Sequence, residues 1–108
     1  MCYSWWVLSA LAILGRLDWI DAPALQRFIL SCQDEIDGGI SDRPDDEPDV
    51  FHTFFGLAGL SLLGHPGLEP VDPTFALPVA TLARHGVQCL PAASPAGGGG
   101  GAPAAAAG

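Results

Sequence analysis

Two stretches of the chain are dominated by apolar residues, and both follow the same pattern. Residues 3–15 align without a gap with residues 52–64, at a period of 49 residues; a pair of Trp matches a pair of Phe, and both stretches end in Gly. Self-similarity of this kind is typical of a repeat architecture whose unit is one supersecondary element. Because each stretch is apolar nearly all round, we predict two buried helices, ended by Gly15 and Gly64 in the left-handed conformation.

Amphipathic segments follow both apolar stretches. Residues 21–33 start with Asp21 as an N-cap and carry apolar residues at i, i+3, i+4 and i+7, which predicts an outward-facing helix. A further helix is predicted from Pro78 to His85. Residues 1–90 are therefore predicted to form, in this order, an inner helix, an outer helix, a loop, an inner helix and an outer helix. Together these elements make about two helical-hairpin repeats. Such arrays usually need at least three repeats, so the pattern indicates part of a longer array.

The negative charge is concentrated in the loop between the predicted hairpins. Residues 34–49 hold eight acidic residues and one Arg, a net charge of −7 out of −8 for the chain. A solvated loop is the simplest interpretation and a functional loop the alternative. Residues 91–108 contain only Gly, Ala, Pro and Ser, so we expect a disordered tail there.

Composition excludes several classes of function. A length of 108 residues allows one small domain and not a multidomain enzyme. A net charge of −8 and a pI near 4.3 oppose binding to nucleic acid or to an anionic membrane, so we expect neither. Three cysteines, 30 and 57 residues apart, fit no disulfide framework, which favours a cytoplasmic protein. The apolar run from Trp5 to Leu14 lacks the basic flank and cleavage site of a signal peptide, so we favour a buried helix over a targeting segment.

Cys2 and His52 are candidate metal ligands. The repeat places them one residue out of register, each in the first turn of an inner helix. Neighbouring helices about 8–10 Å apart would let both side chains reach one zinc ion. Their separation of 50 residues matches no zinc motif, however, so spacing alone favours a buried cysteine and a histidine in a capping turn.

Several consecutive motifs resemble a known family. They are Cys2-Tyr-Ser-Trp-Trp-Val-Leu, Phe28-Ile-Leu-Ser-Cys-Gln-Asp, Asp42-Arg-Pro and the run from Asp49 to Gly64. Over residues 2–88 the sequence resembles the C-terminal part of the protein prenyltransferase β subunits, most closely the Rab geranylgeranyltransferase (type II) group. The resemblance implies an all-α fold, the α/α toroid, in which inner and outer helices alternate around a central cavity.

The resemblance also implies a reaction and its partners. The family transfers a geranylgeranyl group from geranylgeranyl diphosphate to C-terminal cysteines of Rab GTPases, with a prenyltransferase α subunit and a Rab escort protein. Tyr3 matches a tyrosine near the diphosphate, and Trp6 and Phe51 match aromatics that line the isoprenoid pocket. Asp42 matches a carboxylate that, in magnesium-dependent relatives, lies near the diphosphate and its magnesium. Plain core packing is the alternative for the aromatic residues.

A zinc ion that binds the substrate thiol is implied as well. Cys2 and His52 match two of its three protein ligands in the family; the third, an aspartate two residues before the cysteine, has no counterpart in this sequence. We therefore expect an incomplete zinc site, with Asp42 as the nearest other carboxylate by motif. The sequence is interpreted as a truncated β subunit. A non-catalytic helical fragment that acts at most as an interaction module is the competing hypothesis.

Overall fold

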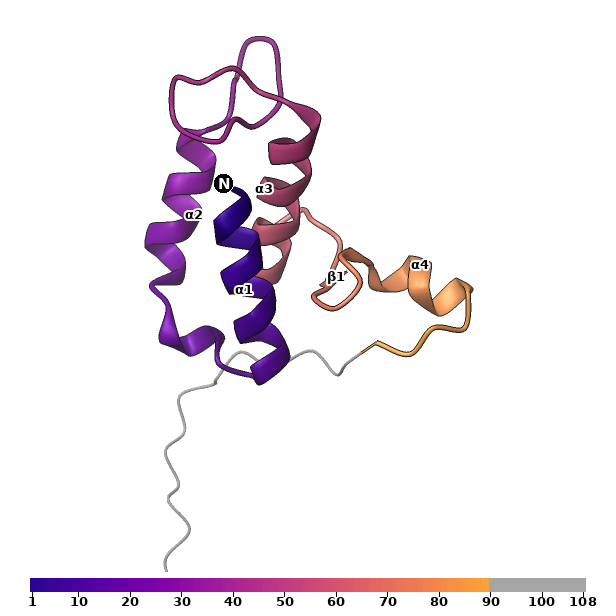
Figure 1. Ribbon diagram of the computed structural model, residues 1–108. Helices are drawn as coiled ribbons and strands as arrows, with labels where there is room; N and C mark the ends of the chain where they lie inside the picture. Colours follow the sequence, from indigo (N-terminus) through magenta and orange to yellow (C-terminus); the bar gives the residue numbers. More distant parts are fainter. Residues whose placement is uncertain (90–108) are drawn as a thin grey trace, which may run out of the picture.

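The computed structural model describes residues 1–89 and is built mainly of helices (Figure 1). Its elements are the helices α1 (Cys2–Leu14), α2 (Ala22–Ser31), α3 (Val50–Leu62) and α4 (Val79–Arg84), the short 3-10 helix η1 (Leu17–Trp19), and the antiparallel strands β1 (Val71–Asp72) and β2 (Leu77–Pro78). The all-α prediction is confirmed, and the two-residue strands are an addition that the sequence pattern did not predict. Within residues 1–89, no helix combines the length and apolarity that crossing a membrane requires. The tail predicted at 91–108 lies outside the described residues.

The helix ends follow the predicted caps. Asp21 accepts a hydrogen bond from the backbone N–H of Ala24 at 3.0 Å and begins α2. Gly15 ends α1 with φ of 69°, and Gly64 follows α3 with φ of 75°, the left-handed conformation that glycine adopts without steric cost. These local signals position the two long apolar helices.

The last helix is shorter than predicted. Pro78 is the N-cap of α4 and His85 its C-cap, so each of these two residues falls outside the helix. The helix continues directly from β2 and lies apart from the three longer helices in Figure 1. The predicted order of elements holds, but this second outer helix does not run along α3 in the way that α2 does.

The two repeated helices lie side by side. In Figure 1, α1 and α3 run in the same direction, and α2 runs the opposite way beside α3. A period of 49 residues predicts this parallel pairing of equivalent helices. Both neighbours come close to α3 at Gly59, where a Cβ would lie at van der Waals distance, 3.4 Å from Leu8 of α1 and 3.5 Å from Ile29 of α2. All three helices therefore meet at the middle of α3.

The core lies between these helices and the start of the acidic loop. It is formed by the buried side chains of Met1, Ile29, Cys32, Ile40 and Leu60. Fully burying one such aliphatic side chain contributes roughly 1.5–3 kcal/mol. Because Ile40 belongs to the loop, the core includes part of a segment that its charge pattern assigns to solvent.

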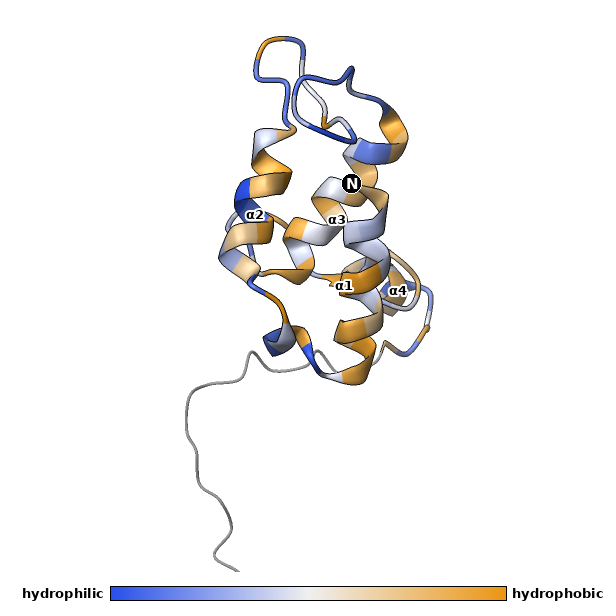
Figure 2. Cartoon of the chain, turned by 60° about the vertical axis from the view of Figure 1, so that its left-hand side comes forward, coloured by the Kyte–Doolittle hydropathy of each residue, from blue (hydrophilic) through white to orange (hydrophobic). Residues whose placement is uncertain are grey.

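The outer face of α1 is not buried, so the prediction of helices buried on all sides is wrong. Trp5 is buried, but Tyr3 is 72% exposed and Trp6 is 52% exposed. Figure 2 shows apolar colour along α1 and hydrophilic colour over much of the loop above α2 and α3. Within residues 1–89, α1 packs mainly against α3, because two hairpins cannot enclose an apolar helix completely.

Candidate metal centre

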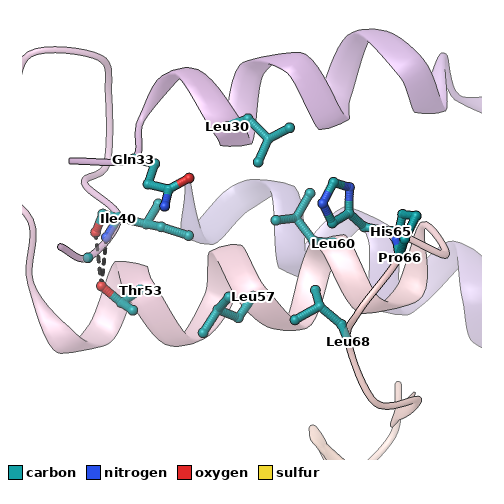
Figure 3. Close-up of a pocket in the computed structure, with 10 residues that line it drawn as sticks. Leu30, Gln33, Ile40, Thr53, Leu57, Leu60, His65, Pro66 and Leu68 are labelled. Atoms are coloured by element: carbon teal, nitrogen blue, oxygen red, sulfur yellow. Dashed lines mark hydrogen bonds between the residues drawn. The ribbon is translucent and has the colours of Figure 1, made fainter. Parts of the chain in front are cut away.

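The acidic loop is anchored to α3 just before Asp42. The backbone N–H of Ile40 donates to Thr53 Oγ1 at 2.8 Å, and the Thr53 hydroxyl donates to the Ile40 carbonyl at 3.3 Å (Figure 3). Ser41 is 1% exposed and its hydroxyl donates to the carbonyl of Cys32 at 3.0 Å. Because buried polar groups are nearly always paired, these bonds fix the loop backbone here. The solvated-loop interpretation is therefore wrong for residues 40–41.

Cys2, Asp42 and His52 come together where α1 and α3 begin. One ligand atom of each residue lies within 4.8 Å of those of the other two. Nε2 of His52 is 3.4 Å from Oδ1 of Asp42. The parallel helices supply Cys2 and His52 from their first turns, and the anchored loop supplies Asp42. The same Oδ1 also lies 2.6 Å from the amino group of Met1.

The donor set fits a zinc ion. Zinc binds thiolate, imidazole and carboxylate at about 2.0–2.3 Å, which places tetrahedral ligands about 3.4–3.7 Å apart. The 3.4 Å between His52 and Asp42 agrees with that spacing. Catalytic zinc sites use three protein ligands and leave a fourth position open, and the cluster offers three. Magnesium prefers oxygen ligands alone, whereas this cluster combines sulfur, nitrogen and oxygen donors. A magnesium ion near Asp42 stays a prediction.

The carboxylates around the cluster are held in their ionised form. The hydrogen bond from the amino group of Met1 lowers the pKa of Asp42, and the charges of His52 and Arg43 act in the same direction. The hydrogen bond from the ring of His52 lowers the pKa of Asp49, together with the backbone N–H of His52. Ionised carboxylates are the form that binds or supports a cation.

Asp49 has a second contact that the sequence pattern did not reveal. It is the N-cap of α3 and accepts a hydrogen bond from the backbone N–H of His52 at 2.8 Å. Its other carboxylate oxygen lies 2.5 Å from Nδ1 of the same histidine. An aspartate at an N-cap, three residues before a candidate histidine ligand, is the signal that could have indicated this contact.

The three aromatic residues predicted to bind substrate lie on the surface next to the cluster. Tyr3 and Trp6 pack edge to face on α1, with ring centroids 5.1 Å apart. Phe51 packs edge to face against the ring of His52, also at 5.1 Å. At 72%, 52% and 51% exposed respectively, they are accessible to a ligand, and their predicted contacts with diphosphate and isoprenoid stay predictions.

A separate hollow lies between α2 and α3. It measures about 320 Å³, and four of its ten lining residues are leucines, with Thr53 and His65 among its polar residues (Figure 3). None of the residues predicted to bind metal, diphosphate or isoprenoid lines this hollow. The candidate chemistry is therefore confined to the end of α1 and α3 that faces the acidic loop.

Parallel inner helices with an antiparallel outer helix form the helical hairpins of an α/α toroid. The family model described as the prenyltransferase alpha-alpha toroid domain matches residues 1–77, and the chain belongs to this family. The resemblance to prenyltransferase β subunits drawn from the motifs is confirmed.

Known relatives agree with this assignment. The geranylgeranyl transferase type-2 subunit beta of Saccharomyces cerevisiae is 61% identical over 84 residues, a match that covers 78% of this chain and 26% of the relative. Subunit beta 1 of the Arabidopsis thaliana type-2 enzyme is 58% identical with the same coverage. The type-1 subunit beta of Arabidopsis thaliana is 38% identical over 80% of the chain and 22% of the relative. The chain thus spans about a quarter of the length of the relatives that it matches.

Proposed function

We propose that this chain forms the zinc-binding part of a geranylgeranyl transferase β subunit. The reaction is the transfer of a geranylgeranyl group from its diphosphate to C-terminal cysteines of Rab GTPases. The observation that carries the proposal is the convergence of Cys2, Asp42 and His52 within 4.8 Å, in a chain whose relatives are named geranylgeranyl transferases. Three protein ligands from three separate segments match the composition of a catalytic zinc site.

The chemistry follows from this donor set. A zinc ion held there would bind the thiol of the substrate cysteine and keep it as a thiolate at neutral pH. The thiolate sulfur forms a bond to C1 of the geranylgeranyl group, while the bond from C1 to the diphosphate oxygen breaks and diphosphate leaves with the electron pair. Cys2, Asp42 and His52 would hold the ion, and with it the reacting thiolate, between two helices and a loop.

Surface residues beside the cluster suit the other parts of the substrate. Tyr3 follows Cys2 directly, and its exposed hydroxyl can donate a hydrogen bond to a diphosphate oxygen. Trp6 and Phe51 offer exposed aromatic surface of the kind that buries an isoprenoid chain. This arrangement brings polar, metal-binding and apolar groups to one end of the helix pair.

The function requires further proteins. The relatives are named as β subunits, so an α subunit is a partner, with a Rab escort protein and Rab GTPases as the substrate complex. The reaction takes place in the cytoplasm, where thiols stay reduced. Cys2, Cys32 and Cys89 are all free, in agreement with that environment.

The alternative is a non-catalytic helical module that only binds another protein. The exposed face of α1 favours it, because Tyr3, Trp6 and Val7 present apolar surface that a partner could cover. This alternative requires no zinc and no transfer.

Metal binding and transfer, measured with the full chain, separate the two functions. Zinc content is determined for the wild type, Cys2→Ser, His52→Ala and the control Cys89→Ser; transfer of labelled geranylgeranyl is then assayed with an α subunit, escort protein and Rab GTPase added. We expect zinc in the wild type and control only, and transfer only in the complete mixture. Zinc without transfer in that mixture would favour the module, and a wild type without zinc would refute the proposed site.

A further inference from the structure

The contact between α1 and α3 is made by pairs of residues that the repeat reproduces elsewhere in the chain. Trp5 of α1 packs against Phe55 of α3, with ring centroids 6.2 Å apart. Shifting the first residue forward and the second back by the period of 49 gives Phe54 and Trp6. Both side chains are exposed, Phe54 by 46% and Trp6 by 52%. The same contact could therefore form again between α3 of one copy and α1 of another.

Two more contacts between the helices follow the same rule. Cys2 meets His52 in the metal cluster, and Leu8 lies 3.4 Å from the place of a Cβ on Gly59. The shift by one period turns these two pairs into pairs of exposed residues, Phe51 with Tyr3 and Leu57 with Ala10. Three internal contacts thus have three exposed counterparts.

The counterparts form one exposed face on each helix. The free face of α1 consists of Tyr3, Trp6 and Ala10, and the free face of α3 consists of Phe51, Phe54 and Leu57. Neither helix contains Asp, Glu, Lys or Arg, so no like charges oppose contact between the two faces. Repeat arrays usually end in polar faces that keep them soluble, whereas the helix pair described here is apolar on both sides.

We propose that a second copy of this chain docks head to tail on the first, with the free face of its α1 against the free face of α3. This contact continues from copy to copy the parallel packing that α1 and α3 already have inside each copy (Figure 1). A second copy is the matching occupant because its α1 is the repeat equivalent of α3. The two faces differ, so the interface is heterologous and every added copy offers a further free face of α3.

The hairpin of β1 and β2 limits the extent of the contact. The hydroxyl of Ser61 donates to the carbonyl of Glu69 at 2.6 Å and accepts the N–H of Val71 at 3.1 Å, which covers α3 near its C-terminal end. Closer to the start of α3, Phe54 and Leu57 line an open hollow of about 140 Å³ beside the hairpin. The interface is therefore confined to the first part of α3, and small interfaces of this kind are weak.

The proposal goes beyond the transferase function and does not depend on the zinc site, because neither free face contains a candidate metal ligand. The assembly would nevertheless cover Tyr3, Trp6 and Phe51, which the proposed function places beside the substrate. A copy whose free face of α1 is occupied by another copy therefore has no isoprenoid surface there. Assembly and substrate binding exclude one another.

Charged substitutions on each face, made in the full chain, test the pairing. Trp6→Glu places a charge on the free face of α1, and Phe54→Glu places one on the free face of α3. Ile36→Glu is the matched control, because Ile36 is 93% exposed in the acidic loop and belongs to neither face. Ala10→Glu and Leu57→Glu are second variants of the two faces. Circular dichroism and thermal melts check that each variant retains its helices.

Sedimentation velocity then measures association at chain concentrations up to about 0.5 mM, because small interfaces are weak. We expect the wild type and Ile36→Glu to form a concentration-dependent series of dimers and larger species. Trp6→Glu and Phe54→Glu should each stay monomeric. A 1:1 mixture of these two variants should form dimers and nothing larger, because one intact face of α1 and one intact face of α3 remain in the pair.

Other results would overturn the proposal. A wild type that is monomeric at the highest concentration would show that the faces do not bind each other. If only Trp6→Glu or only Phe54→Glu lowers association, identical faces pair with one another; if the mixture stays monomeric, the two faces do not pair. Metal affinity, measured with Co²⁺ as a spectroscopic probe for zinc, tests the proposed function separately from all of these results.

Discussion

Replacing Thr53 with valine tests how the acidic loop is held over the helix pair. Valine has nearly the same shape as threonine, so Thr53→Val removes the two hydrogen bonds to Ile40 without opening a cavity. The N–H of Ile40 would lose an acceptor at 2.8 Å, and Ile40 itself is only 5% exposed. Leaving a buried donor unpaired costs about 1–3 kcal/mol. Because the hollow beside Thr53 lets some water approach, we expect a loss of about 1–2 kcal/mol in the free energy of unfolding.

Urea unfolding followed by tryptophan fluorescence measures this loss, because Trp5 is buried in the native chain. With a dependence on urea of about 2 kcal/mol per M, the middle of the range for small proteins, the midpoint should fall by about 0.5–1 M. Thr53→Ser is the control; it keeps the hydroxyl and should lose less than about 0.8 kcal/mol, the value of one buried methylene. Because Asp42 is two residues from Ile40, Co²⁺ affinity should also fall in Thr53→Val and not in Thr53→Ser.

Equal midpoints and equal Co²⁺ affinities for the valine and serine variants would refute this reasoning. Such a result would mean that the loop holds its position without the hydroxyl of Thr53. The contacts of Ser41 with the end of α2 would then have to account for the placement of Asp42.

Three further predictions concern packing, acid sensitivity and association. In thermal melts, Gly56→Ala should destabilise the chain by about 1–3 kcal/mol, because the new Cβ would lie 2.8 Å from Ile40 Cδ1. Gly59→Ala is the control. Its new Cβ has its nearest contact at 3.4 Å, so this variant should stabilise the chain by up to about 1 kcal/mol. The backbone N–H groups of Asp37 and Ile36 lower the pKa of Asp34 below its ordinary value of 3.8. The stability that Asp34 contributes is therefore present above pH 3.8 and is lost as the pH falls through the pKa of the folded state. A ¹³C NMR titration of the Asp34 carboxyl group should show this lowered pKa, and an ordinary pKa would contradict the prediction. Sedimentation of the isolated chain should show self-association through exposed side chains such as Trp6, and Trp6→Ser should shift it towards monomer; a compact wild-type monomer would contradict this.

The sequence predicted the helix pair well because its signals there are local or repeated. The period of 49 residues relates α1 to α3, and Asp21, Asp49 and Gly15 mark helix ends by their own chemistry. Each of these signals depends on neighbouring residues or on direct comparison of two segments.

The placement of Asp42 was harder to predict. Its surroundings are strongly acidic, and such a pattern favours solvent exposure. What places the loop is a set of long-range contacts, between Ile40 and Thr53 and between Ser41 and Cys32, which no local pattern contains. The burial of Ile40 at 5% exposure also depends on Gly56, which leaves room for its side chain.

The positions of the three candidate ligands along the chain connect metal content with folding. Cys2 and His52 are 50 residues apart, and Asp42 lies between them, so an ion bound to all three would act as a cross-link that closes a long segment. A ligand bound only by the folded state, at a concentration 100 times its dissociation constant, adds about 2.7 kcal/mol to stability. Zinc supply would then set how much of the chain is folded, and chelation would expose the apolar surfaces between α1 and α3 to aggregation.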